Sequence, residues 1–220
     1  MSLSRQNISL VIVTLKSESV IHECIESIDQ NIPIIVIENS NDHEFKKKIE
    51  SRYKNLKCHV TGKNLGMGAA NNIGIKLAST DYVYILNPDT TLEKETLENL
   101  FQASKDLHNF SIISPIHSNK NLPNWKKKSK EDFDKTKPFK VDSIDGYSMI
   151  LNKKKFNDSY FDENFFLYLE NDDLCLRTRK LGDLIFIVPN SVVNHKAAKA
   201  VDPKYEKEIE FSRNWHWIWS

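Results

Sequence analysis

The run from Tyr82 to Asp89 combines an apolar segment with a single acidic residue at its end. Its first five residues, Tyr82 to Leu86, predict a buried strand, and Asn87-Pro88-Asp89 forms a polar turn directly after it. In open α/β sheets, ligands bind just beyond the carboxyl ends of the strands. A carboxylate at that place can hold a hard divalent cation, and the cation can hold phosphates. Asp89 therefore predicts a phosphate-bearing substrate.

Two further loops follow predicted strands and carry side chains suited to a nucleotide. The turn at 38–42 opens with Glu38, whose carboxylate could accept a hydrogen bond from a base N–H or a ribose hydroxyl. The loop at 64–72 places Gly66 and Gly68 before a predicted helix, where the backbone can approach a ligand closely and the helix amino terminus favours phosphate. A tight turn alone explains the two glycines equally well. A dinucleotide fingerprint is not expected, because its G-x-G should follow the first strand and include a third glycine.

Three carboxylates, Glu170, Asp172 and Asp173, lie close together behind an aromatic segment at 160–168. The structural explanation is that they decorate the positive end of a helix dipole, with Arg177 as a surface partner of Asp173. The functional interpretation makes one of them a general base that its neighbours orient. Glu170 and Asp173 are three residues apart and share a helix face. We favour Glu170 as the base and Asp173 as its orienting or acceptor-binding partner.

His195 is the remaining candidate for chemistry, because it follows the β-branched pair Val192-Val193 at a predicted strand end. A lone histidine is more often a structural or solvated residue than a ligand. In this position, however, a neutral imidazole could complete a cation site with Asp89.

These residues need a sheet to position them, and the first half of the chain predicts one. Strand and helix patterns alternate four times there, which is typical of a parallel sheet with right-handed crossovers. The expected strands lie at 8–15, 34–37, 57–61 and 82–86, and the expected helices at 20–28, 43–53, 69–78 and 94–107. We therefore predict a doubly wound nucleotide-binding half.

The second half of the chain is less regular. Short strands are expected at 112–116, 146–151, 184–188 and 191–194, and helices at 170–181 and from 202 onward. The connection at 117–140 has little periodicity, and a connection of that length inside a compact domain is usually functional or mobile. We interpret this connection as a lid.

Bulk composition limits the classes of function. A chain of 220 residues with 40% hydrophobic residues suits one α/β domain with a real core, and a net charge of +1 argues against nucleic acid as the main partner. The three cysteines lack C-x-x-C spacing, which predicts neither a disulfide framework nor a zinc site and favours a reducing cytoplasm. Neither a signal peptide nor an apolar run of membrane-spanning length is evident. We expect a soluble or peripherally bound protein.

Taken together, several segments resemble the family 2 inverting glycosyltransferases, particularly the rhamnosyltransferase-like branch. The resemblance runs from about residue 8 to the carboxyl terminus, and its motifs are specific through their order and spacing. The motifs are V-I-V-T-L at 11–15, V-I-E-N-S at 36–40, N-L-G-M-G-A-A-N-N-I-G at 64–74, Y-I-L-N-P-D at 84–89, Y-F-D-E-N-F-F-L-Y-L-E-N-D-D-L-C-L-R at 160–177 and R-N at 213–214.

The resemblance implies a GT-A fold, that is, an α/β, Rossmann-like, mostly parallel sheet with helices on both faces and a smaller acceptor-side second half. It implies one domain over 1–220, with a nucleotide-sugar-binding half at 1–110, an acceptor and catalytic half at 111–200 and an aromatic helix at 201–220. The implied enzyme is metal-dependent and transfers a hexosyl group with inversion in cell-surface polysaccharide synthesis. Its donor would be a nucleotide-diphosphate sugar, with dTDP-rhamnose as one candidate, and its acceptor a glycan or a lipid-linked sugar. Mg or Mn would bridge the protein and the pyrophosphate.

The resemblance also implies roles for individual residues. Glu38 matches the acidic residue that reads the base, and Gly146 begins the segment that lines the reaction centre. Asp89 matches the metal ligand of the D-x-D motif, and His195 is similar to the family's distal histidine ligand. The nucleotide-sugar-binding residues implied are Thr14, Leu15, Glu38, Asn64, Gly66, Gly68, Asn71, Asn72, Asn87 and Gly146.

Two departures from the family pattern bear on activity. The D-x-D motif is Asn87-Pro88-Asp89, so one carboxylate remains at the metal. The usual E-D-x-D places its base at Asn171, which cannot usefully accept a proton, so either Glu170 or Asp172 takes over that role or activity is low. A weak or inactive nucleotide-sugar-binding relic is therefore one alternative. A nucleotidyltransferase is a second, less favoured one, because a Gly- and Lys-rich loop does not follow the first strand.

Aromatic residues crowd the carboxyl terminus, on more faces than one packing stripe needs. We interpret this segment first as a continuation of the core, in a chain that could be truncated. The second interpretation is peripheral docking at the inner face of the plasma membrane, near a lipid-linked acceptor. The aromatic residues concerned are Phe211, Trp215, Trp217 and Trp219, together with the apolar Ile218.

Overall fold

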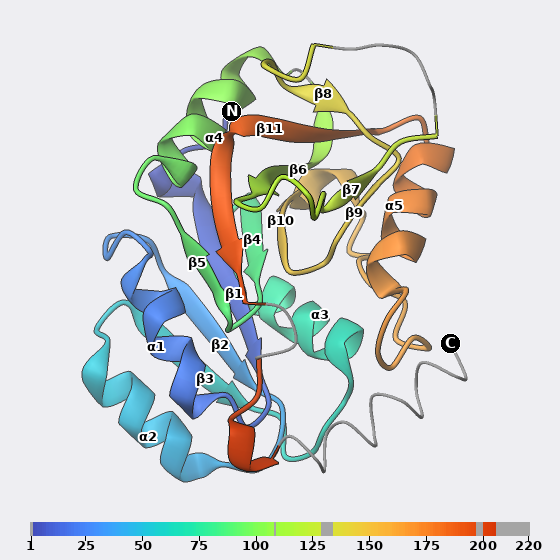
Figure 1. Ribbon diagram of the computed structural model, residues 1–220. Helices are drawn as coiled ribbons and strands as arrows, with labels where there is room; N and C mark the ends of the chain where they lie inside the picture. Colours follow the sequence, from blue (N-terminus) through green and yellow to red (C-terminus); the bar gives the residue numbers. More distant parts are fainter. Residues whose placement is uncertain (1, 108, 129–133, 197–199, 206–220) are drawn as a thin grey trace.

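A mixed sheet runs through the molecule and joins its two halves (Figure 1). The computed structural model describes residues 2–107, 109–128, 134–196 and 200–205. Within them, the strand order is β3-β2-β1-β4-β10-β6-β11-β5, with β8 paired to β11, while β7 and β9 form a separate ribbon. The strands are β1 Ile8–Thr14, β2 Ile34–Glu38, β3 Leu56–Val60, β4 Tyr82–Leu86, β5 Thr90–Leu92, β6 Phe110–His117, β7 Trp125–Lys126, β8 Phe139–Lys140, β9 Ser143–Ile144, β10 Ser148–Asn152 and β11 Leu184–His195.

The predicted doubly wound half is confirmed. Strands β3, β2, β1 and β4 are parallel neighbours, and a helix follows each of β1, β2 and β3. Their carboxyl ends therefore share one edge of the sheet. The helices are α1 Glu18–Glu26, α2 His43–Arg52, α3 Met67–Leu77, α4 Thr96–Asp106 and α5 Glu170–Lys180, with 3-10 turns at Arg5–Asn7, Lys153–Lys155 and Pro203–Tyr205.

Helices cover both faces of the sheet, as expected. Alternate residues of β1 show this, because Leu10 and Ile12 enter one hydrophobic core while Val11 enters the other. The first core also contains buried residues of α1, α2 and α4, and the second contains buried residues of α3 and α5. All of β1 is buried, which explains why its sequence is a near-continuous apolar run.

The second half differs from the prediction in its strands. The strands expected at 184–188 and 191–194 are one strand, β11, whose pairing with β6 shifts register between Val188 and Val192. Pro189 cannot donate a ladder hydrogen bond, and the irregularity absorbs it where the sequence pattern indicated a break. Strand β5 was not expected, because its three residues pair only with the distant β11. The connection at 117–140 also contains β7, which pairs with β9, and β8, which pairs with β11.

The helix expected from residue 202 begins as a short 3-10 turn at Pro203–Tyr205. The rest of that predicted helix, with its aromatic residues, lies outside the described part of the chain. Among the helices that the structure describes, none combines the length and the apolar character needed to cross a bilayer.

Candidate functional site

Asp89 lies just past the carboxyl end of β4. The backbone N–H of Asn87 donates to the Tyr147 carbonyl oxygen at 2.9 Å, and that of Thr90 donates to the Asn87 carbonyl oxygen at 3.1 Å, so the turn is held from both sides. Asp89 is only 2% exposed, and within the described chain neither of its carboxylate oxygens has a hydrogen-bond partner. Buried carboxylate oxygens are costly unless something binds them. The turn is therefore suited to a ligand that satisfies Asp89.

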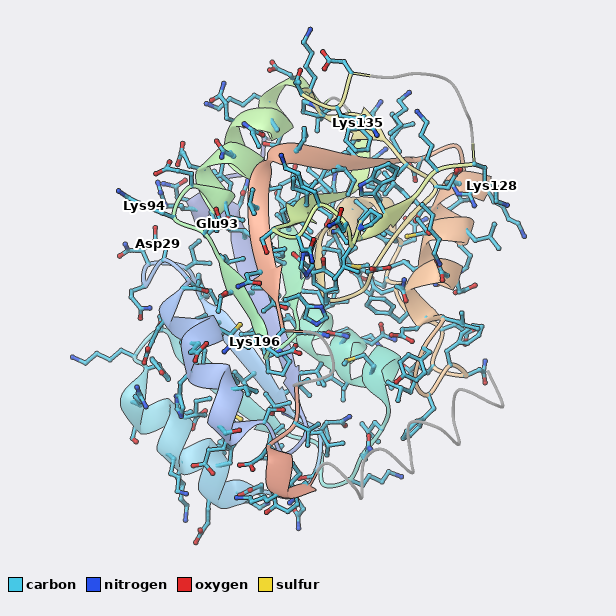
Figure 2. All side chains as sticks on the ribbon, viewed as in Figure 1. Asp29, Glu93, Lys94, Lys128, Lys135 and Lys196 are labelled. Carbon is cyan, nitrogen blue, oxygen red and sulfur yellow. The ribbon has the colours of Figure 1, made fainter. Side chains whose placement is uncertain are left out.

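His195 ends β11 and faces Asp89. Its Nε2 atom lies 3.3 Å from Asp89 Oδ1, close enough for an ion pair but without hydrogen-bond geometry. The Tyr147 ring stacks on the imidazole, with ring centroids 4.0 Å apart and planes 14° from parallel. The next residue, Lys196, donates its backbone N–H to the Asp89 carbonyl oxygen at 3.1 Å, and Figure 2 shows it where β11 ends. The fold thus brings together the two residues predicted as metal ligands.

His117 supports His195 from β6. Its Nδ1 atom accepts the Asn119 backbone N–H at 2.8 Å, so its proton is assigned to Nε2, which lies 3.3 Å from the His195 carbonyl oxygen. Its ring also packs edge-on against Tyr147 and His195. Sequence reasoning missed His117 and Tyr147, because only the pairing of β6, β10 and β11 brings them to the site. Such outer contacts orient a ligating imidazole.

A divalent cation fits the pair of Asp89 and His195. A carboxylate that accepts no hydrogen bond from the described residues and an adjacent imidazole are both ligands that Mn²⁺ accepts. Mg²⁺ commonly uses one or two carboxylates together with water and substrate phosphates. Among the described residues, no cluster of three or more His, Cys, Asp or Glu side chains could hold a metal. The protein therefore offers two ligands, and water or phosphate oxygens would supply the others.

Glu38 ends β2 beside Thr14, the last residue of β1. Its buried carboxylate accepts hydrogen bonds from the Ser40 backbone N–H at 3.1 Å, the Ser40 hydroxyl at 2.7 Å and the Asp42 backbone N–H at 3.1 Å. A carboxylate has about four lone-pair sites, so Glu38 shapes its own turn and keeps capacity for one ligand donor. The Thr14 hydroxyl donates to the Ile37 carbonyl oxygen at 3.4 Å and is less available.

Asn39, which sequence reasoning did not single out, fastens the loop that precedes α3. Its Nδ2 donates to Asn64 Oδ1 at 3.0 Å, and its Oδ1 accepts the Leu65 backbone N–H at 3.0 Å. The Gly66 backbone N–H donates to Asn64 Oδ1 at 3.0 Å as well. Asparagine in a turn commonly bonds backbone groups in this way, which is the signal that could have identified Asn39.

The aromatic segment closes over the same loop. The Met67 backbone N–H donates to the Phe166 carbonyl oxygen at 2.8 Å. Gly66 has a φ of +84°, and a Cβ atom there would lie 2.3 Å from that oxygen, so only glycine fits. The loop and the segment border a pocket of about 100 Å³ at the strand ends. Its lining includes Leu15, Asn64, Gly66, Pro88, Phe166 and Val201.

The two predicted donor-binding asparagines of α3 differ in their surroundings. Asn72 is fully engaged, because its Nδ2 donates to the Phe161 carbonyl oxygen at 2.9 Å and to Glu163 Oε1 at 3.0 Å, while its Oδ1 accepts the Phe161 backbone N–H at 3.0 Å. Asn71 is buried, and its Oδ1 has no partner within the described chain. Asn72 therefore ties α3 to the aromatic segment, while Asn71 retains an oxygen for a ligand.

Two of the three predicted catalytic carboxylates are held in ion pairs. Asp172 lies 3.1 Å from Lys126 Nζ, and Asp173 lies 2.8 Å from Arg177 Nε. Arg177 also donates to the Tyr160 carbonyl oxygen, so the Asp173 pair anchors α5 to the aromatic segment. The structural explanation, in which Arg177 is the helix-surface partner of Asp173, therefore accounts for this carboxylate.

Glu170 has a different environment at the start of α5. It is 8% exposed, and its Oε2 has no partner among the residues described. Burial raises the pKa of its carboxyl group, and the charge of Asp172 raises this pKa further. Gly68 lies beside it, since a Cβ atom on Gly68 would be 3.6 Å from the Glu170 Cβ. Glu170 thus lies where the start of α5 contacts the start of α3.

Asn171, at the position where the family pattern places its base, connects α5 to the loop between β9 and β10. Its Nδ2 donates to the Ile144 carbonyl oxygen at 2.8 Å, and a Cβ atom on Gly146 would lie 3.3 Å from its own Cβ. The contact places Gly146 against the first turn of α5. Between these two anchor points lies Asp145, a half-buried carboxylate that sequence reasoning missed.

The arrangement is that of a GT-A glycosyltransferase fold, and solved structures bear this out. Staphylococcus aureus TarS (residues 1–349) superposes with a TM-score of 0.66 at 19% identity over 86% of this chain and 60% of that chain. GalNAc-T7 with UDP, GalNAc and Mn²⁺ superposes with a TM-score of 0.65 at 13% identity over 87% of this chain and 44% of that chain. These likenesses show the fold.

The chain belongs to glycosyl transferase family 2, whose model matches residues 9–176. The low-salt glycan biosynthesis hexosyltransferase Agl10 of Haloferax volcanii is 27% identical over 79% of this chain, which spans 62% of that protein. The rhamnosyltransferase WbbL of Escherichia coli K12 is 25% identical over 94% of this chain and 88% of its own length. The resemblance to family 2, drawn from the sequence motifs, is confirmed.

Proposed function

We propose that this chain transfers a sugar from a nucleotide-diphosphate sugar to a hydroxyl group of a glycan or lipid-linked acceptor, with inversion at the anomeric carbon. The observation that carries the proposal is the pair of Asp89 and His195 at the strand ends, in which neither carboxylate oxygen of Asp89 has a hydrogen-bond partner among the described residues. Similarity to a rhamnosyltransferase and a hexosyltransferase of glycan biosynthesis supports the class of reaction. dTDP-rhamnose is the first donor to test, and cell-surface polysaccharide synthesis is the proposed context.

On the donor side, each group has a chemical task. Glu38 would accept a hydrogen bond from the nucleoside, and Asn71 would meet a donor hydroxyl or phosphate near the amino terminus of α3. Asp89 and His195 would hold Mg or Mn, which when bound neutralises charge on the diphosphate leaving group. The Mn²⁺ and UDP bound to GalNAc-T7, which shares the fold, support this choice of ligand class.

On the acceptor side, we assign the base role to Glu170. The acceptor oxygen forms a bond to the anomeric carbon while the bond from that carbon to the diphosphate oxygen breaks, so the nucleotide diphosphate departs from the opposite face. The hydroxyl proton passes to the Glu170 carboxylate, which its burial makes a stronger base than an ordinary glutamate. Asp172 and Asp173 are less suited, because Lys126 and Arg177 already bind them.

The proposal is tested by the cation dependence of turnover. Purified protein is incubated with dTDP-rhamnose and a panel of UDP sugars, with and without Mn²⁺, and release of the nucleoside diphosphate is measured. We expect Mn²⁺-dependent release that Asp89→Asn lowers by about 100-fold or more, since a catalytic metal contributes several kcal/mol.

The control variant is Asp106→Asn, an exposed carboxylate at the far end of α4, which should leave release unchanged. Donor binding without any release would favour the non-catalytic alternative suggested by Asn87 and Asn171. Release that Asp89→Asn does not affect would rule out the assigned cation site.

A further inference from the structure

Asp145 is a carboxylate to which the proposed mechanism has assigned no task. It lies in the short loop between β9 and β10 and is half-buried. Within the described chain, its carboxylate oxygens have neither a hydrogen bond nor an ion pair, whereas nearby Asp142 and Asp172 bind Arg179 and Lys126. A half-buried carboxylate without a direct partner is available to a ligand.

The backbone around Asp145 is held rigidly on both sides. The Asp145 backbone N–H donates to the Asn124 carbonyl oxygen at 2.9 Å, and the Asn171 side chain holds the preceding carbonyl of Ile144 at 2.8 Å. On the other side, Tyr147 stacks on His195. The loop therefore holds the Asp145 backbone between Tyr147, which stacks on His195, and the start of α5, the region to which we assign the acceptor of the proposed reaction.

Charged groups of both the cation pair and α5 lie near Asp145. Burial raises the pKa of Asp145, and among its charged neighbours Asp172 raises this pKa while Lys126, His195 and His117 lower it. The charge of Asp172 also raises the pKa of Glu170, so Asp145 and the proposed base have Asp172 as a common neighbour. Asp145, Asp172 and Lys126 form a group in which two side chains are carboxylates and one is an ammonium group.

We propose that Asp145 binds hydroxyl groups of the acceptor and that it selects a neutral sugar over a phosphate-bearing one. An ionised carboxylate accepts hydrogen bonds at both oxygens, which suits neighbouring hydroxyl groups of a sugar ring. The same carboxylate, beside Asp172, repels a phosphate, because the single ammonium of Lys126 is already shared with Asp172. This inference rests on the proposed function and adds the acceptor class to it.

The test compares acceptors that differ only in a phosphate. Wild type, Asp145→Asn and Asp145→Ser are assayed with the donor that wild type hydrolyses, using a panel of octyl glycosides and their 6-phosphates. The readouts are KM and kcat for each acceptor, together with donor hydrolysis without acceptor. Asp106→Asn serves as the matched control.

We expect wild type to use the neutral glycoside at least about tenfold more efficiently than its phosphate. Both Asp145 variants should raise KM for the neutral acceptor by about tenfold, the worth of a hydrogen bond to a charged group, with kcat and donor hydrolysis within about twofold of wild type. The ratio of kcat/KM for the neutral glycoside to kcat/KM for its phosphate should also fall in both variants. Unchanged donor hydrolysis shows that the variants are folded.

The inference would be overturned by equal or better use of the phosphate by wild type, by an unchanged KM in both variants, or by donor hydrolysis without transfer to any neutral glycoside. A fall in kcat with KM unchanged would also overturn it, since the carboxylate would then act on the reaction step. Absence of both donor hydrolysis and transfer to any acceptor in wild type is a separate outcome, which contradicts the proposed function itself.

Discussion

Glu170 shows how position alone can prepare an ordinary carboxyl group for base chemistry. Its neighbours in the acidic run have similar chemistry, yet Asp172 and Asp173 lie against cations at 3.1 Å and 2.8 Å while Glu170 faces inward toward α3. Burial disfavours the ionised form, which raises the pKa. A base of higher pKa captures an acceptor proton more readily, as long as the working pH lies above that pKa.

The pH dependence of turnover follows from this raised pKa. Because Glu170 must be ionised to accept a proton, kcat should fall as the pH drops through its folded-state pKa, and the midpoint should lie above the ordinary range of a glutamate. This fall at low pH is the acidic limb of the profile. Glu170→Gln should remove the acidic limb and lower kcat by about 100-fold or more. The measurement is a pH profile of kcat at saturating donor and acceptor.

Asp173→Asn is the informative companion variant. It breaks the pair with Arg177 and leaves Glu170 in place, so it should retain the acidic limb at a reduced rate. If Glu170→Gln keeps both its rate and its acidic limb, another group is the base.

At the scale of elements, the aromatic segment at 160–168 works as a brace between α3 and α5. Asn72 holds Phe161 from α3, Arg177 holds the Tyr160 carbonyl from α5, and Gly66 lets the Phe166 carbonyl approach the loop. The brace thereby couples the loop before α3 to the helix that carries the proposed base.

The contact at Gly66 predicts a stability difference between two glycines of similar conformation. Gly62 has a φ of +83° with nothing near its missing Cβ, whereas Gly66 has a φ of +84° and the Phe166 carbonyl oxygen 2.3 Å from that position. Gly62→Ala should cost about 1 kcal/mol of unfolding free energy for the backbone strain alone. Gly66→Ala should cost roughly 2 kcal/mol more, because it adds a clash with backbone atoms.

Urea denaturation followed by circular dichroism measures both variants under the same conditions. Equal losses of stability would show that the aromatic segment gives way freely and does not brace the loop.

The sequence predicted those parts of the fold and site that local patterns determine. The strand ends that carry Glu38 and Asp89 were predicted because apolar runs followed by polar turns need no tertiary information. By contrast, β5 and the role of His117 depend on partners far along the chain, so no local pattern revealed them. Asp145 was missed for a related reason. Its significance comes from the lack of a partner, which only a three-dimensional neighbourhood can show.

At the scale of the whole molecule, β10 joins the two halves into one sheet. It is antiparallel to β4 on one side and to β6 on the other, with Ile150 opposite both Tyr84 and Ile113. The hydrophobic core on each face likewise contains residues from before and after residue 110. We therefore propose that the predicted halves, 1–110 and 111–200, form one cooperative unit.

Native-state hydrogen exchange checks this proposal. Amides in the middle of β1 and β6 should share one limiting free energy of opening, equal to that of global unfolding, since neither strand can open fully without exposing the common cores. Helix α2 packs at one edge of the sheet and should open at lower free energy. Separate limiting values for β1 and β6 would show two folding units instead of one.

The placement of His195 at the end of β11 has a consequence for biosynthesis. Asp89 leaves the ribosome more than one hundred residues before its imidazole partner, and chains generally begin folding from the amino terminus during synthesis. The proposed two-ligand cation pair is therefore incomplete until β11 has been made and has paired with β6. Because the hydrophobic cores on both faces also contain residues from after residue 110, the nascent chain completes its fold and its proposed chemistry together. A growing chain would thus be kept from consuming nucleotide sugar until most of it has been translated.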